Sequence, residues 1–279
     1  MPTQTHFPAS PVQAASLPAS SNGSNHGFHA SPYLNNDIDS DIDNGSFDAD
    51  GFAAETLSDW RKLAAVIDHT LLNPDATRTQ VENLCDEAVR YNFACAMVNP
   101  VWVSTAASLL AGSGIPVGVV IGFPLGATLA STLRHEAESL TRLGAKELDM
   151  VISIGELKSG NHAAVERTIR SVAEVVHSRG ALLKVILETC LLSVEEKLRA
   201  SEIAIQAGTD FLKTSTGFSS NGATAVDVAL LRGVAGARCG VKASGGIRSL
   251  ADARTMLEAG ANRIGASASV TMVRELGAE

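Results

Sequence analysis

The chain has 279 residues, enough for one large domain or two ordinary ones, and carries a formal net charge of −8 at pH 7. Eight acidic residues and no Lys or Arg precede Arg61; without those eight, the 30 acidic residues of the chain become 22 and balance its 22 basic residues. The negative charge therefore belongs to the first sixty residues, and the neutral remainder offers no basic face for nucleic acid or for an anionic membrane.

Residues 1–54 are rich in Ser, Asn, Asp, Ala and Pro and show no sustained apolar period. Such a composition cannot bury enough apolar surface to offset the entropy lost on ordering. The sequence therefore predicts a disordered, low-complexity acidic tail over residues 1–54 and a folded domain over residues 55–279. The tail has neither the charge pattern of a secretory signal nor the Arg content of a transit peptide, and no apolar run is long enough to cross a bilayer. We expect a cytoplasmic protein without a membrane partner.

Short apolar runs, typical of strands, alternate with helical patterns through the predicted domain. A helical pattern over 56–62 precedes the first predicted strand, 64–68, and a predicted helix over 77–91 leads to a second strand over 93–98. Six more apolar runs each begin just after a glycine, and these glycines are Gly114, Gly144, Gly180, Gly208, Gly240 and Gly260. Glycine at the end of a helix, followed by an apolar strand, is typical of a parallel sheet whose two faces are both covered.

Eight predicted strands in about 220 residues suit a (β/α)8 TIM barrel. The alternative is a doubly wound open sheet, which in its dinucleotide-binding form carries G-x-G-x-x-G after the first strand. Here the first strand ends in Asp68-His-Thr-Leu-Leu, which contains no glycine. The sequence therefore favours an α/β fold of the (β/α)8 barrel type.

Charged residues occur at or near the carboxyl ends of five predicted strands, where a barrel holds its catalytic groups. They are Asp68, Asp149, Lys184, Lys213 and Lys242. A single such residue has an ordinary explanation, for example a lysine whose stem packs while its ammonium group reaches solvent. Five charges on five strands, within apolar runs from which charges are normally excluded, predict a functional cluster instead.

Lys213 ends a short apolar run and is followed by a hydroxyl-rich turn that reaches Gly217. Burial lowers the pKa of a lysine, and Lys242 on the neighbouring strand disfavours a second ammonium group nearby, so one of the two lysines should be a neutral amine. Such an amine can attack a carbonyl to form an iminium ion, an electron sink for making or breaking the neighbouring carbon–carbon bond. Asp149 can then transfer protons, and no metal or other cofactor is required. The pattern indicates a class I aldolase.

Small residues follow the last three predicted strands. They are Gly217, the segment Ser244-Gly-Gly-Ile-Arg248, and the segment Gly265-Ala-Ser267. Backbone N–H groups at such positions can approach an anion, and barrels often hold phosphate in the loops after strands 7 and 8. The alternative is a set of plain tight turns. We expect a small phosphorylated substrate, and no metal site, because the four cysteines are scattered and the histidines lack ligand spacing.

Eight motifs follow one another along the predicted domain: Ile67-Asp-His-Thr-Leu-Leu72, Val98-Asn-Pro100, Gly122-Phe-Pro-Leu-Gly126, Glu147-Leu-Asp-Met-Val-Ile152, Leu183-Lys-Val-Ile-Leu-Glu-Thr189, Lys213-Thr-Ser-Thr-Gly217, Val241-Lys-Ala-Ser-Gly-Gly-Ile-Arg248 and Arg263-Ile-Gly265. Through these motifs, residues 63–279 resemble the 2-deoxyribose-5-phosphate aldolase family. The resemblance implies that Lys213 forms the Schiff base, that Lys242 tunes it or relays protons, and that Asp149 donates or accepts protons.

The same resemblance implies reversible cleavage of 2-deoxy-D-ribose 5-phosphate to D-glyceraldehyde 3-phosphate and acetaldehyde, without a cofactor, by a homodimer. The predicted substrate-binding residues are Asp68, Lys184, Thr214, Gly217, Gly245, Gly246, Arg248, Gly265 and Ser267.

Two positions depart from part of that family. Phe218 stands where some members have a lysine that helps to hold phosphate, and Ala268 stands where some have a second serine. We therefore expect phosphate to be held more weakly, with the lysine chemistry unchanged. Two alternatives stay open at this point: a different lysine-dependent aldolase of similar barrel type, and a non-catalytic barrel that binds a sugar phosphate and is regulated through its tail.

Overall fold

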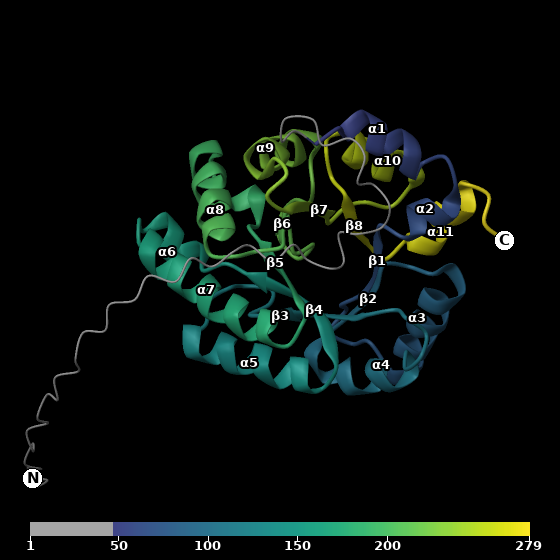
Figure 1. Ribbon diagram of the computed structural model, residues 1–279, viewed down its shortest axis with the longest axis horizontal. Coiled ribbons are helices and arrows are strands. Elements are labelled where there is room, and N and C mark those ends of the chain that lie inside the picture. Colours follow the sequence, from purple (N-terminus) through teal and green to yellow (C-terminus); the bar gives the residue numbers. More distant parts are fainter. Residues whose placement is uncertain (1–46) are drawn as a thin grey trace, which may run out of the picture. The chain divides into compact units, whose positions relative to one another are not determined.

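The computed structural model describes residues 47–279, so the part of the predicted tail over residues 1–46 lies outside the described residues. Eight parallel strands pair in sequence order and close into a barrel (Figure 1). The strands are β1 (Ile67–Leu71), β2 (Cys95–Val98), β3 (Val117–Ile121), β4 (Ala145–Val151), β5 (Leu182–Ile186), β6 (Phe211–Lys213), β7 (Gly240–Ser244) and β8 (Arg263–Ala266). The predicted (β/α)8 barrel is confirmed.

Helices alternate with the strands and cover the outside of the barrel (Figure 1). They are α3 (Arg78–Tyr91), α4 (Val103–Leu109), α5 (Ala130–Arg142), α6 (Ile154–Lys158), α7 (His162–Ser178), α8 (Val194–Gln206), α9 (Ala225–Ala235), α10 (Leu250–Glu258) and α11 (Ser269–Glu275). In α7 the buried residues Val165, Ile169, Val172 and Val176 recur every three or four positions and form the face that meets the barrel. None of the helices in residues 47–279 has the length and apolarity needed to cross a membrane.

Two further helices, α1 (Ala49–Thr56) and α2 (Trp60–Ala64), precede the first strand. Helix α1 begins at Asp48, whose carboxylate accepts a hydrogen bond from the Gly51 N–H, and it packs against α10 (Figure 1). The predicted boundary between residues 54 and 55 falls inside α1, so the folded part of the chain begins earlier than expected. Ala53 is only 1% exposed, because α10 supplies a packing surface that the local composition does not reveal.

The first strand begins three residues later than predicted, at Ile67 instead of residue 64. Leu63 and Ala64 are fully buried, but they belong to the end of α2. A short apolar run does not distinguish a buried helix end from a buried strand, and this ambiguity explains the error. Asp68 consequently lies in the second position of β1 and not at its end.

The strand register brings the charged residues to similar levels inside the barrel. Asp149 on β4 pairs with Lys184 on β5, and Lys213 on β6 pairs with Lys242 on β7. Gly265 on β8 leaves space for one of these side chains, because a β-carbon there would lie only 2.9 Å from Cε of Lys242. The barrel closes through β1 and β8, where the Ile264 N–H donates a hydrogen bond to the Val66 carbonyl oxygen.

Candidate active site

Two lysines and one aspartate form the centre of the site, here called the trio (Lys213, Lys242 and Asp149). Nζ of Lys213 lies 2.7 Å from Oδ2 of Asp149, and Nζ of Lys242 lies 2.7 Å from the same oxygen. Lys213 is 3% exposed and Lys242 is 1% exposed. Lys213 is therefore not a lysine whose head reaches solvent, and the structure brings together the three residues that were predicted as catalytic.

A second group of charges adjoins the trio and is called the ionic quartet (Asp68, Lys184, Glu147 and Arg263). Lys184 pairs with Asp68 at 3.0 Å and with Glu147, and Arg263 pairs with the same two carboxylates at 2.9 Å and 3.6 Å. The quartet touches the trio through two contacts: Lys184 lies 3.2 Å from Oδ1 of Asp149, and Lys242 pairs with Asp68.

Sequence reasoning gave no role to Glu147 or Arg263. Glu147 lies two residues before Asp149 on β4, and alternate residues of a strand point to the same face, so its position was a usable signal. Arg263 begins β8, where a charged residue is usually solvated, and only the fold brings its guanidinium group to Asp68.

The electrostatic environment distinguishes Lys213. Burial lowers the pKa of its amine to about 8, with repulsion from Lys242 adding to this effect and the Asp149 carboxylate opposing it. The predicted repulsion between the lysines is therefore present, although burial is the larger cause. For Lys184, burial is outweighed by Asp149, Asp68 and Glu147, which together hold its pKa well above the ordinary value. Lys213 can release its proton near neutral pH, whereas Lys184 remains an ammonium group.

The predicted substrate-binding residues fall into two sets. Asp68 and Lys184 are completely buried and their charges are engaged within the quartet, so they support the trio from inside the barrel. Thr214 is also buried; its hydroxyl donates to the Ser244 carbonyl oxygen and accepts from the Ser244 N–H, both at 3.1 Å, and so links the ends of β6 and β7. These three residues stabilise the arrangement of the site from within the barrel. They contribute less to the solvent-facing opening of the barrel, here called the mouth.

The remaining predicted residues lie in or next to the loops after β6, β7 and β8. They are Gly217, Gly245, Gly246, Arg248, Gly265 and Ser267. Gly217, Gly245 and Gly246 have φ angles of 85°, 88° and 80°, a left-handed conformation that glycine adopts without strain. A β-carbon on Gly245 would lie 3.4 Å from Cα of Gly217, so the structure brings these two loops together. Arg248 and Ser267 are exposed.

Two hydroxyl groups that were not predicted as site residues lie beside these elements. Ser215 follows β6 and Ser244 ends β7; both side-chain oxygens are buried, and neither has a hydrogen-bond partner within the described part of the chain. A buried hydroxyl group without a partner is costly, so both are suited to bind a polar ligand.

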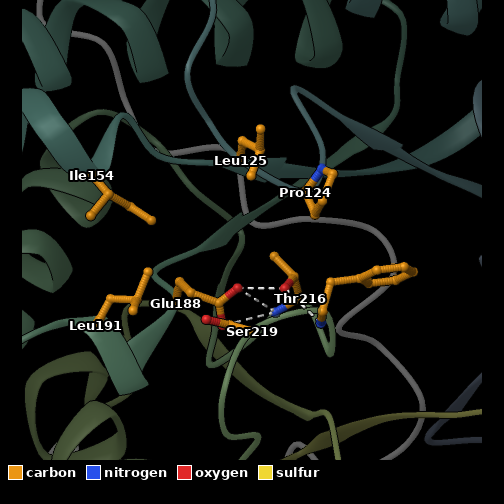
Figure 2. A pocket seen from close by; sticks show the side chains of 8 residues that line it. Pro124, Leu125, Ile154, Glu188, Leu191, Thr216 and Ser219 are labelled. Atoms are coloured by element: carbon orange, nitrogen blue, oxygen red, sulfur yellow. Dashed lines mark hydrogen bonds between the residues drawn. The ribbon is translucent and has the colours of Figure 1, made fainter.

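A hollow of about 100 Å³, open to solvent, lies among the loops that follow β3, β4, β5 and β6 (Figure 2). Its lining residues are Pro124, Leu125, Ile154, Glu188, Leu191, Thr216, Phe218 and Ser219. Figure 2 shows Glu188 next to Thr216, whose hydroxyl group donates a hydrogen bond to the buried carboxylate. Phe218 is half exposed and packs edge-on against Phe123, with ring centroids 5.2 Å apart. The mouth therefore has an apolar side in addition to its glycine-rich side.

One cluster of possible metal ligands overlaps the quartet. Asp68, Cys95 and Glu147 offer donor atoms within 4.8 Å of one another. Both carboxylates are already paired with Lys184 and Arg263, and burial, with the two carboxylates nearby, raises the pKa of the Cys95 thiol well above its usual value. Because metal binding requires deprotonated ligands, this donor set fits an ion-pair network better than a metal centre.

Comparison with known proteins gives consistent matches. A family model described as "DeoC/LacD family aldolase" matches residues 62–272. The deoxyribose-phosphate aldolase of Geobacillus sp. (strain WCH70) is 53% identical over 211 residues, which are 76% of this chain and 94% of that protein. The deoxyribose-phosphate aldolase of Listeria monocytogenes serovar 1/2a is 54% identical over the same shares of the two chains. Among solved structures, the deoxyribose phosphate aldolase of Aeropyrum pernix matches with a TM-score of 0.76 and 37% identity, over 82% of this chain and 96% of that one.

Proposed function

Since this chain belongs to the deoxyribose-phosphate aldolase family, we propose that it cleaves 2-deoxy-D-ribose 5-phosphate reversibly to D-glyceraldehyde 3-phosphate and acetaldehyde through a Schiff base on Lys213. One observation carries the assignment of the nucleophile. Lys213 is a buried lysine with a pKa of about 8, and its nitrogen lies within hydrogen-bond distance of a carboxylate that it shares with a second lysine. A surface or structural lysine has no need of this environment.

The chemistry starts at the amine of Lys213. The unprotonated amine adds to the C1 aldehyde of the open-chain sugar, and loss of water from the adduct leaves an iminium ion. Removal of the proton from the C3 hydroxyl group breaks the C2–C3 bond, because the bonding electrons move into the iminium and form an enamine. The C3–C5 fragment leaves as D-glyceraldehyde 3-phosphate. Protonation of the enamine at C2 and addition of water then release acetaldehyde and regenerate the amine.

Each proton transfer needs a group that can both accept and donate. Asp149 and Lys242 meet this requirement, because a carboxylate and an ammonium group in contact can exchange a proton directly or through water. We assign the phosphate to the glycine-rich side of the mouth, formed by Gly217, Gly245 and Gly246, because backbone N–H groups of such loops can bind an anion. The unpaired hydroxyl groups of Ser215 and Ser244 are candidates for the sugar hydroxyls.

Two wider predictions belong to the same proposal. The first is the cytoplasmic location that the sequence predicts, which we propose for this protein. The predicted homodimer remains a prediction. The solved Aeropyrum pernix enzyme is described as a unique tetramer, which is a property of that protein.

The experiment that tests this function is reductive trapping. The full-length protein is incubated with acetaldehyde and sodium borohydride, digested and analysed by mass spectrometry. We expect an ethyl adduct on Lys213 that is absent from Lys213→Ala. An adduct on Lys242 would reverse the roles of the two lysines. The absence of any adduct on folded protein would overturn the Schiff-base mechanism, and turnover of dihydroxyacetone phosphate instead of acetaldehyde would point to a different lysine-dependent aldolase.

A further inference from the structure

The ionic quartet is a closed ring of alternating charge. Going around the ring, Asp68 contacts Lys184, Lys184 contacts Glu147, Glu147 contacts Arg263 and Arg263 contacts Asp68. Two carboxylates and two cations make the ring neutral. Charges that are removed from water are costly unless they are paired, and each charge of the ring has two partners of opposite sign within it.

The trio has no such balance. Its single carboxylate, Asp149, faces two lysines, so one positive charge remains unmatched when all three groups are ionised. Because the quartet is neutral as a whole, the surplus originates in the trio, although the Lys242–Asp68 and Lys184–Asp149 contacts couple the two groups electrostatically. A buried surplus charge is relieved when one of the lysines loses its proton.

We propose that Glu147 and Arg263, neither of which contacts Lys213, are positioning residues of opposite sign that keep the charge behind the trio neutral and so set how readily Lys213 becomes a free amine. The inference rests on the proposed function only in that it takes Lys213 as the nucleophile. The inference goes beyond the proposed function because it gives two residues outside the trio a measurable effect on how readily Lys213 loses its proton.

The charged groups around Lys213 come from almost every side of the barrel. They are Asp149 and Glu147 on β4, Lys184 on β5, Lys242 on β7, Arg263 on β8 and Asp68 on β1, together with the Cys95 thiol on β2. Strand β3 (Val117–Ile121) carries no titratable side chain. Helix α8, which packs on β6, has its charged side chains partly or fully exposed, and Glu188 beyond β5 is engaged by Thr216.

Removing either ring charge changes the balance in a known direction. Glu147→Gln leaves the ring with a surplus positive charge, which disfavours the Lys213 ammonium group further and lowers its pKa. Arg263→Gln leaves a surplus negative charge, which favours the ammonium group and raises the pKa. One unit charge roughly 10 Å away in a protein interior corresponds to a shift of about one pH unit. The double variant restores neutrality and should return close to the wild-type value.

The experiment measures two pH profiles for the wild type, the two single variants and the double variant. The first is kcat/KM for 2-deoxy-D-ribose 5-phosphate, whose acid limb reports ionisation in the free enzyme. The second is the rate of acetaldehyde trapping on Lys213 with cyanoborohydride, followed by mass spectrometry. Arg263→Lys is the matched control, because it keeps the charge while changing the shape of the side chain, and its midpoint should not move.

We expect the midpoint of both pH profiles to lie at a lower pH for Glu147→Gln and at a higher pH for Arg263→Gln than for the wild type. In the double variant the two shifts should cancel. Midpoints that stay fixed, or that move in the same direction in both folded single variants, would overturn the inference. Circular dichroism establishes that each variant is folded. Arg263 lies at the edge of the ring with 12% of its side chain exposed, so its variants should fold. If Glu147→Gln does not fold, the comparison of Arg263→Gln with Arg263→Lys tests the inference by itself. A wild-type protein that is not trapped on Lys213 would instead contradict the proposed function.

Discussion

Lys213 and Lys242 lie directly opposite each other on β6 and β7, and both direct their nitrogen atoms to the same oxygen of Asp149. One carboxylate oxygen is thereby shared between a nucleophile and a second lysine. This arrangement keeps two like charges close together in a buried place, which is unfavourable for folding but favourable for a reaction that needs one neutral amine.

The first prediction concerns Asp149→Asn. The amide cannot exchange protons and cannot balance the charge of either lysine, so we expect kcat to fall by at least about 100-fold with little change in KM. We also expect the free energy of unfolding to fall by about 3–5 kcal/mol, because a buried ion pair has lost one partner. Steady-state kinetics and urea denaturation measure the two effects. Asp75→Asn, at an exposed position, is the control and should change neither.

The second prediction is the pH dependence of the wild-type enzyme. Only the unprotonated amine attacks an aldehyde, and the pKa of Lys213 is about 8. We therefore expect kcat/KM to rise about tenfold per pH unit below pH 8 and to level off above it. A profile that is flat between pH 6 and 8 would contradict this assignment of the nucleophile.

The third prediction concerns the stability of Lys213→Met. The pKa of about 8 in the folded protein lies below the ordinary lysine pKa of 10.5, so the unfolded state binds more protons between these two pH values. At pH 7 the native state carries the full cost of the buried ammonium group, which is about 3 kcal/mol, and this cost is lost as the pH rises from 8 to 10.5. Asp149 keeps Lys184 and Lys242 as partners in the variant.

Lys213→Met should consequently be inactive but more stable than the wild type at pH 7, with a gain that shrinks as the pH rises through this window. Urea denaturation at several pH values measures the difference. Lys62→Met, at an exposed position, should show no such pH-dependent gain. A variant that is less stable than the wild type at pH 7 would show that the contact with Asp149 outweighs the cost of burial.

The fourth prediction concerns phosphate. Phe218 lies half exposed beside Gly217, and a lysine in its place would put an ammonium group next to the glycine-rich loops. We expect the double variant Phe218→Lys, Ala268→Ser to lower KM for the phosphorylated substrate three- to tenfold with kcat little changed, and the effect to weaken at high salt. Leu125→Lys, at another exposed residue that lines the hollow, is the matched control. A KM equal to that of the wild type would show that backbone groups alone hold the phosphate.

The fifth prediction concerns Glu188, which is buried and has a left-handed φ of 57°. Its carboxylate accepts the Thr216 hydroxyl, which in turn accepts the Phe218 N–H at 3.0 Å, so it fixes the loop that carries Gly217. Glu188→Ala should raise KM for 2-deoxy-D-ribose 5-phosphate several-fold, while trapping of free acetaldehyde on Lys213 stays at the wild-type rate. Thr216→Val removes the same contact from the other side and should behave alike. Equal losses in both assays would mean that Glu188 supports Lys213 itself.

Local chemistry made the barrel and the trio predictable from the sequence. A charged residue in an apolar strand is rare enough to be noticed, and Lys213, Lys242 and Asp149 each occur in such a run. Glu147 was missed because the sequence does not show that it meets Lys184 on the neighbouring strand β5 and Arg263 on β8. Those contacts join residues from three strands and depend on how the barrel closes.

The errors at the amino end of the domain have a related cause. One apolar run, residues 63–67, covers both the end of α2 and the first residue of β1, so composition alone could not show where the helix ends and β1 begins. Helix α1 has only eight residues, too few to be stable alone, and its stability depends on packing against α10, which lies near the other end of the sequence.

The pairing of β1 with β8 has a consequence for how the protein is made on the ribosome. The first strand to be synthesised receives one of its two neighbours only when the last strand has been completed. Until then β1 presents an unpaired edge, and such edges promote association between nascent or partly folded chains. The α1–α10 contact must likewise wait until α10, the helix just before β8, has been synthesised. The growing chain therefore carries this unpaired edge for most of the time that translation takes.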